Sequence, residues 1–368
     1  MNKFSDKIRN IDFISLILVF ILSLLSLVIL QSTMYDGSFK ITRLVLVQAL
    51  SFLAGFVAIG LIQLLDYRML KDMRLILYIC TIVLLLSVYV PGLGYEQFGS
   101  RAWINLGFTT LQPSEFAKIL FIFILADYLS EHRNDLNNFW DIFKVLIYSA
   151  PIIGIVLKED LGSALVFIVV WIFMVFFAGI NYKVLLEYFL LACASVPIIY
   201  TFLSSYQKER IEAFLHPENL ALAGNYQVWQ SKVAIGSGGL TGKGLFQGTQ
   251  KGLDFLPVQQ SDFVFSVIVE ELGFLGGAFV ILIYLLLMIR FTKIMRDCID
   301  LYGALLVVGF LSMFLFQVFE NVAMTMGLMP VTGITLPLLS AGGTSVIASM
   351  ISIGVVLNVG ANSKGINY

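Results

Sequence analysis

Apolar residues occupy long runs along this chain, and short polar segments separate the runs. About 20 consecutive apolar residues allow a helix to cross the hydrocarbon core of a bilayer. The pattern predicts ten membrane-spanning helices, at 13–31, 44–65, 74–91, 114–130, 142–157, 161–180, 183–203, 263–289, 301–324 and 337–361. Only Lys158, Glu159 and Asp160 separate the fifth run from the sixth, so one re-entrant hairpin, and hence nine spans, is the alternative. The prediction is an all-α integral membrane protein, with residues 1–368 forming a single polytopic membrane domain.

Composition supports the assignment to a membrane. Apolar residues make up 59% of the 368 residues, charged residues only 13%, and the mean hydropathy is +0.91. Soluble domains carry roughly a quarter charged residues, so this chain could not cover a water-facing surface of its size. The net charge of −1 argues against a nucleic-acid partner. Three cysteines and two histidines lie far apart, which excludes a disulfide framework and a histidine or cysteine metal motif.

Lysine and arginine residues gather at one end of the predicted helices. The N-terminus and the loops after even-numbered spans hold most of them, whereas the short loops at the other end hold only Lys40, Arg43, Arg101 and Lys158. Cytoplasmic loops carry the excess of positive charge, so both termini are predicted to be cytoplasmic.

The longest hydrophilic stretch, 204–262, lies between the seventh and eighth spans and is therefore predicted to be extracytoplasmic. A loop of this length is usually functional or disordered. Apolar residues such as Trp229, Ile235 and Phe246 argue against disorder. We expect short interfacial helices in this loop, on the outer face of the membrane.

The loop before the fourth span, and the start of that span, contain candidate binding residues. Arg101 and Trp103 precede the span, and Glu115 and Lys118 stand three residues apart, so they can pair on one helix face. One interpretation is a capped helix with an interfacial tryptophan and a lysine that reaches toward the membrane surface. The other is a cationic site for an anionic head-group.

Two further polar segments face the predicted outer side. Asp160 lies in the turn between the fifth and sixth spans, where it either belongs to a simple polar turn or points into the cavity near Lys118. The glycine-rich segment 236–244 contains Lys243, and its backbone N–H groups could approach a pyrophosphate; a plain turn is the alternative.

Asp262 is placed where the long outer loop meets the apolar eighth span. It could cap that helix, as could Ser261. Alternatively, partial desolvation would raise the pKa of its carboxyl and make it a better base. Glu270 and Glu271 lie deeper, where Glu320 and Asn321 are plausible partners for them.

At these motifs the sequence resembles the SEDS family (shape, elongation, division and sporulation), and within it the RodA-like branch. Each motif is weak alone, but their order and spacing together are specific. The matching residues are Trp103-Ile104, Gln112-Pro113-Ser114-Glu115, Lys118, Asp160-Leu161-Gly162, Gly242-Lys243-Gly244, Gly248-Thr249-Gln250, Leu256-Pro257, Ser261-Asp262-Phe263, Glu270-Glu271-Leu272-Gly273, Leu336-Pro337, Ser340 and Gly342-Gly343.

The resemblance implies a peptidoglycan glycosyltransferase with ten membrane helices, which polymerises lipid II on the outer face of the bacterial plasma membrane during cell elongation. It places Asp262 on the family's essential aspartate, and Trp103, Glu115, Lys118 and Asp160 on other important positions. Arg101, Lys243 and Ser340 are further candidates for substrate contact. Implied partners are a class B penicillin-binding protein, which is a transpeptidase, and other proteins of the elongation complex.

The chain departs from the family pattern at several positions. Val258 stands where many relatives have Glu, and Glu159 where proline is usual. A divalent cation such as Mg²⁺ is a conceivable cofactor for pyrophosphate chemistry, although the sequence shows no dedicated ligand set. The alternatives to an enzyme are a flippase for the same lipid-linked precursor and a non-catalytic scaffold for the transpeptidase.

Overall fold

The computed structural model describes residues 10–35, 37, 39–97, 100–105, 107, 110–133, 138–222, 224–249 and 258–363. The helices are α2 (Phe13–Thr33), α3 (Arg43–Leu64), α4 (Arg74–Leu86), α5 (Pro113–Glu131), α6 (Phe139–Glu159), α7 (Leu161–Ala178), α8 (Tyr182–Phe202), α9 (Ser205–Leu215), α10 (Asn225–Gly238), α12 (Val264–Arg296), α13 (Leu301–Thr325) and α14 (Gly343–Ser363). Short 3-10 turns η1 (Tyr67–Leu70) and η2 (Ser87–Tyr89) flank α4.

The prediction of a helical membrane protein is confirmed. Within the described residues, eight helices are long and apolar enough to cross a membrane, and each falls on a predicted span. The remaining two predicted spans coincide with α4, which is shorter, and with α5, which carries four charged residues. Helices α6 and α7 are separate and full-length, so the re-entrant hairpin is excluded.

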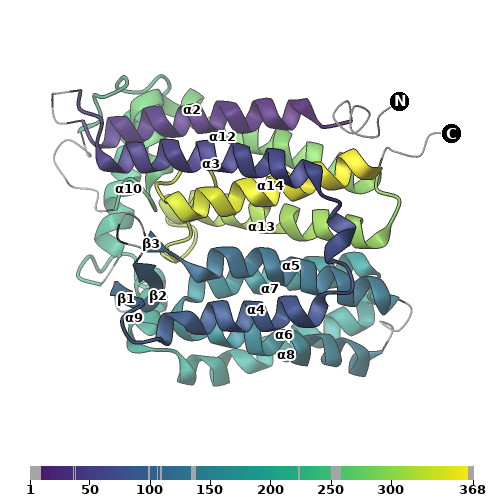
Figure 1. Cartoon of the computed structure of the whole chain (residues 1–368). Helices are drawn as coiled ribbons and strands as arrows, with labels where there is room; N and C mark the ends of the chain where they lie inside the picture. The colour runs from purple at the N-terminus through teal and green to yellow at the C-terminus, as the bar shows by residue number, and fades with distance from the viewer. Residues whose placement is uncertain are drawn as a thin grey trace.

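The helices form two groups that lie side by side in Figure 1, one containing α2, α3, α12, α13 and α14 and the other α4 to α8. Helix α13 joins the groups, because it packs on α12 and α14 and also on α5 and α7. Most of its side chains are buried, including Phe310, Gln317, Glu320 and Asn321. A hydrophobic core therefore continues through the centre of the bundle, with polar groups set into it.

Helices α9 and α10 and a small sheet occupy one end of the bundle, and the first residues of α2 and the last of α14 lie at the opposite end (Figure 1). Both short helices belong to the stretch 204–262, of which residues 223 and 250–257 lie outside the described part. Helix α10 is docked into the bundle, since Ser231 is fully buried and donates to the carbonyl oxygen of Thr325 at 2.7 Å.

The sheet was not predicted. Strands β1 (Gly94–Gln97), β2 (Ser100–Asn105) and β3 (Thr110–Leu111) pair antiparallel in that order, with Tyr95 opposite Trp103 and Ile104 opposite Leu111. The strands are too short, and interrupted by too many glycines, for alternation of apolar and polar residues to identify them.

Helix α12 is broken at Gly273, where φ is 71° and ψ is −170°. The glycine-rich segment 238–244 satisfies the backbone groups that the break sets free. The N–H groups of Lys243 and Gly244 donate to the carbonyls of Glu270 and Glu271 at 3.0 and 2.9 Å, and Phe274 donates to Gly239 at 2.9 Å. These amides are therefore engaged within the protein, which contradicts the idea that they approach a pyrophosphate.

The last predicted span begins too early. Helix α14 starts at Gly343 rather than at residue 337, because Pro337 is followed by Leu338 with a left-handed φ of 66°. Residues 337–342 instead form a turn in which backbone groups contact the segment before α12.

The close packing of α10 on α12 yields a direct test. A Cβ on Gly238 would lie 2.0 Å from the carbonyl oxygen of Val269, whereas one on Gly236 would meet nothing within 4 Å. We expect Gly238→Ala to lower the free energy of unfolding by about 1–3 kcal/mol, because backbone must shift. Gly236→Ala, on the same helix, should leave it unchanged or raise it by up to about 1 kcal/mol. Thermal unfolding of the purified proteins in detergent measures both, and equal behaviour of the two variants would contradict the packing.

Candidate active site

Asp262 lies in a turn immediately before α12. The turn starts at Val258, which has an unusual left-handed φ of 55°, and its carbonyl accepts from the N–H groups of Ser261 and Asp262 at 3.2 Å. Helix α12 has Phe263 at its N-cap position and no side-chain cap. The interpretation of Asp262 as a helix cap is therefore wrong, and its carboxyl is left for another purpose.

Two distant segments hold this turn in place. The side-chain amide of Asn321 in α13 donates to the carbonyls of Asp262 at 3.0 Å and Ile334 at 2.8 Å. The hydroxyl of Ser340 donates to the carbonyl of Ser261 at 2.5 Å and accepts from the N–H of Leu336 at 2.8 Å. Ser340 is 1% exposed, so its hydroxyl positions the turn rather than facing a substrate.

Charged groups from three other elements face Asp262. A Cβ on Gly333 would lie 3.6 Å from Asp262 Oδ2 and 3.9 Å from Nη1 of Arg210 in α9, which places the carboxylate and the guanidinium around the same glycine. Arg210 stacks on the ring of Tyr206 and donates to its hydroxyl. Glu320 interacts electrostatically with both members of this pair, and Asp160 with Asp262.

Protein atoms crowd the Asp262 carboxyl, although the residue keeps partial access to solvent. Burial raises the pKa of this carboxyl, and the negative charge of Asp160 adds to the effect. The hydrogen bond from Ser261 and the positive charge of Arg210 act in the opposite direction and lower it. A carboxylate with a raised pKa is a stronger base than an exposed one, as a proton-accepting role requires.

Glu320 lies behind the cluster, fully buried in α13. One carboxyl oxygen accepts from the hydroxyl of Thr332, next to Gly333. The expected partnership of Glu320 and Asn321 with Glu270 and Glu271 is wrong. Their hydrogen bonds go to the Asp262 turn and to residues 332–334, while Glu271 accepts from the hydroxyl of Ser32 at 2.6 Å.

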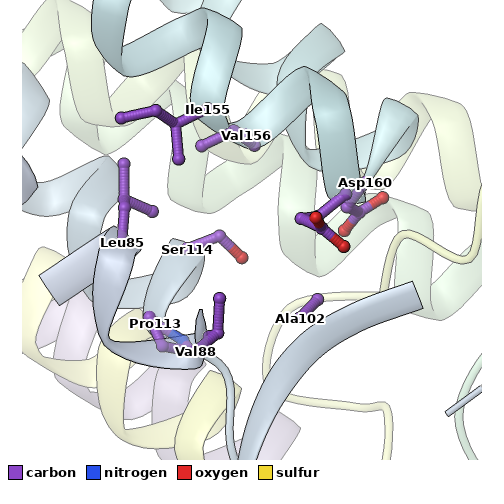
Figure 2. Close-up of a pocket in the computed structure, with 9 residues that line it drawn as sticks. Leu85, Val88, Ala102, Pro113, Ser114, Ile155, Val156 and Asp160 are labelled. Atoms are coloured by element: carbon purple, nitrogen blue, oxygen red, sulfur yellow. The ribbon is translucent and has the colours of Figure 1, made fainter. Parts of the chain in front are cut away.

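Asp160 joins α6 to α7 and uses its carboxylate locally. It accepts from the N–H and the hydroxyl of Ser163 at 3.2 and 2.7 Å, and from the side-chain amide of Gln112 at 3.2 Å. Figure 2 shows Asp160 and Ser114 beside one hollow, with Leu85 and Ile155 on its apolar side. This pocket therefore has an apolar wall, which includes Leu85 of α4 and Ile155 of α6, and polar groups at the end of α6.

Glu115 and Lys118 form the predicted ion pair, with Lys118 Nζ 2.7 Å from Glu115 Oε1. Both side chains are buried in α5, and Lys118 is 3% exposed. Asp160 does not join this pair, because its partners are Gln112 and Ser163. The ion pair lies in the first two turns of α5.

Arg101 and Trp103 lie on β2 and are half-buried. The strand contacts α5, α6 and η2. Ala102, between them, lines the pocket with Asp160. Neighbouring side chains on a strand point to opposite faces, so Arg101 and Trp103 flank this wall residue rather than line the pocket.

Lys243 lies elsewhere. Its ammonium group bonds to Glu270 Oε1 at 2.8 Å and to the hydroxyl of Thr249 at 2.7 Å, and none of its described contacts involves Asp262. Lys243 thus forms an internal ion pair with Glu270 beside the break in α12. The neighbouring motif residues Gln250, Leu256 and Pro257 lie outside the described residues.

No group of three or more histidine, cysteine, aspartate or glutamate side chains in the described part of the chain could hold a metal ion. Asp262, Asp160 and Glu320 thus share a region without forming a preassembled ligand set.

Comparison with known proteins identifies the family. The model of the FtsW, RodA and SpoVE cell cycle proteins matches residues 9–365. The chain belongs to the FtsW/RodA/SpoVE family. This confirms the resemblance inferred from the motifs.

Curated relatives in this family include enzymes. The chain is 37% identical over 314 residues to stage V sporulation protein E of Bacillus subtilis, covering 84% of this chain and 85% of that protein. It is 34% identical over 290 residues to the peptidoglycan glycosyltransferase MrdB of Escherichia coli K12, covering 78% of each. Such similar identities do not separate the branches of the family, so the role in elongation stays a prediction.

A solved structure supports the fold. A peptidoglycan synthase complex, described as coordinating polymerization and crosslinking, matches with a TM-score of 0.82 and 30% identity. The match covers 96% of this chain and 98% of that one.

Arg210 is the member of the cluster that the sequence did not single out. It lies in the long hydrophilic stretch 204–262, where basic residues are common, and only the placement of α9 next to Gly333 brings it to Asp262. Nothing in the surrounding residues Tyr206-Gln207-Lys208-Glu209-Arg210 could have singled it out.

Proposed function

We propose that this chain is a peptidoglycan glycosyltransferase that polymerises lipid II, with Asp262 as the general base. One observation carries the proposal: Asp262 is a crowded carboxyl with a raised pKa, beside Arg210, at the end of a membrane bundle opposite the start of α2. Relatives named peptidoglycan glycosyltransferases support the reaction class.

The reaction joins two lipid-linked disaccharides. The 4-hydroxyl oxygen of the acceptor sugar forms a bond with the anomeric carbon of the donor, and the bond from that carbon to the pyrophosphate oxygen breaks. The hydroxyl proton passes to the Asp262 carboxylate, and the lipid-linked pyrophosphate leaves with the bonding electron pair on its oxygen. A base within hydrogen-bond reach of the hydroxyl contributes about 10²–10⁴-fold to such a step.

Positive charge must offset the charge that develops on the departing pyrophosphate. Arg210 is suited to this task, because it is partly accessible and its guanidinium presents several N–H donors. Lys118 is a weaker candidate, since it is buried and already paired with Glu115. Arg101, on the strand whose Ala102 lines the pocket, is the second candidate cation for a bound head-group.

A membrane bundle suits this substrate. The prenyl chains remain in the lipid phase, while the sugars and phosphates occupy the polar end of the helices. The excess of basic residues near the opposite end supports a cytoplasmic location for the termini and an extracytoplasmic active site. By analogy with the synthase complex, we propose a class B transpeptidase as partner, with other elongation proteins.

A divalent cation, for which we propose Mg²⁺, would take most of its oxygen ligands from the substrate pyrophosphate. Such ions commonly bind through one or two carboxylates together with phosphates. Asp160 and Asp262 are the nearest carboxylates to supply the protein ligands.

The central test is polymerisation of purified lipid II by the reconstituted protein, with and without its transpeptidase. We expect glycan chains from the wild type and a rate about 10²–10⁴-fold lower from Asp262→Asn, since the amide cannot accept the proton. Asp297→Asn, an exposed aspartate at the opposite end of α12, is the matched control and should keep the wild-type rate. Transport of lipid II across liposomes by a wild type that makes no glycan would favour the flippase, and partner binding with neither activity would favour the scaffold.

The pH dependence of the rate tests the role of Arg210. Activity should fall as the pH decreases through the pKa of Asp262, because only the ionised form accepts a proton. Arg210→Gln removes a positive charge that lowers this pKa, so the acidic limb should move to higher pH and the maximal rate should also fall. Lys208→Gln, two residues away on α9, should change neither, because the ammonium group of Lys208 donates to the carbonyl oxygen of Thr201 at 3.2 Å. An Arg210→Gln profile that superimposes on the wild type would refute the assignment.

A further inference from the structure

Lys158 and Glu159, the last two residues of α6, contact Tyr89 and strand β2. The ammonium group of Lys158 lies over the ring of Tyr89, 4.8 Å from its centre. The two carboxylate oxygens of Glu159 accept from the hydroxyl of Tyr89 and from the backbone N–H of Arg101 at 3.0 Å. A simple polar turn would make none of these contacts. Two of them hold Tyr89 of η2, and the third holds the backbone of Arg101.

Strands β1, β2 and β3, called the strap below, are also fastened at their other side. The hydroxyl of Thr344, at the start of α14, lies 3.4 Å from the carbonyl oxygen of Thr110, to which it donates, and the guanidinium of Arg43 donates to the carbonyl of Gly107 at 3.1 Å. The strap is thus attached near Asp160 on one side and to the segment after Ser340, which positions Asp262, on the other. It connects the part of the candidate active site around Asp160 with the part around Asp262.

The attachment at Glu159 is close and polar. Glu159 accepts directly from the backbone N–H of Arg101 at 3.0 Å. Glu159 lines the same pocket as Ala102 and Asp160. Hydrogen bonds to an ionised acceptor are stronger than neutral ones, so this carboxylate is well suited to fix one end of the strap.

We propose that Glu159 is a positioning residue for substrate binding: it fixes the strap over the Asp160 side of the site and so sets the places of Arg101 and Trp103. The inference rests on the proposed function and on the expectation from the sequence that Arg101 and Trp103 contact the lipid-linked substrate. Glu159 itself touches neither the reacting atoms nor Asp262.

Steady-state kinetics of lipid II polymerisation separate positioning from chemistry. Glu159→Ala removes both hydrogen bonds and should raise KM about tenfold, with kcat within about twofold of the wild type. Glu159→Gln should restore the wild-type KM, because its oxygen can accept from Arg101 and its amide can donate to the Tyr89 oxygen. Tyr89→Phe should raise KM less, and adding it to Glu159→Ala should have no further effect.

Hydrogen exchange provides a readout that does not depend on activity. The amides of β2 should exchange faster in Glu159→Ala than in the wild type and Glu159→Gln, while those of α10 stay unchanged. Wild-type KM and wild-type exchange in Glu159→Ala would overturn the proposal, as would a loss confined to kcat. A wild type that makes no glycan would refute the proposed function instead, and the exchange of β2 would still decide whether Glu159 holds the strap.

Discussion

The side-chain amide of Asn321 holds the structure of the site together. It donates to the carbonyl oxygens of Asp262 and Ile334, so one buried group on α13 joins the turn before α12 to the segment that leads to α14. Leaving a buried carbonyl unpaired costs about 1–3 kcal/mol. The irregular backbone that carries Asp262 therefore depends on this amide, and Ser340 and the N–H of Ala341, which donates to Gln260 at 2.8 Å, complete the attachment.

Internal hydrogen bonds to free backbone carbonyls recur at two other places where helices are broken or end. At the break in α12, the amides of segment 238–244 pair with the carbonyls that Gly273 sets free. At the other end of the bundle, the side-chain amide of Asn358 donates to the carbonyls of Ile62 and Leu65 where α3 ends. Non-helical backbone in a membrane protein requires an internal partner for each polar group. The non-helical turn that carries Asp262 follows the same rule through its bonds to Asn321 and Ser340.

Much of this architecture was predictable, because a run of about 20 apolar residues is almost sufficient to identify a membrane helix. The Glu115–Lys118 pair was also predictable, since both residues lie on one helix face. Contacts between distant segments were not. No local signal associates Arg210 with Asp262, and Lys243, whose glycine-rich surroundings suggested phosphate binding, instead pairs with Glu270. Residues 337–342 were assigned to a helix because their apolar character resembles that of a span, although Pro337 and the left-handed Leu338 form a turn.

The most direct measurement compares two buried asparagines in lipid II polymerisation. Asn321→Ala removes the amide that positions Asp262, and Asn358→Ala removes an equivalent amide at the opposite end of the bundle. Both variants should lose a similar amount of thermal stability. At a temperature where both are folded, only Asn321→Ala should lose activity, by about a hundredfold, because the base Asp262 is misplaced. Equal rates for the two variants would contradict the dependence of Asp262 on this contact.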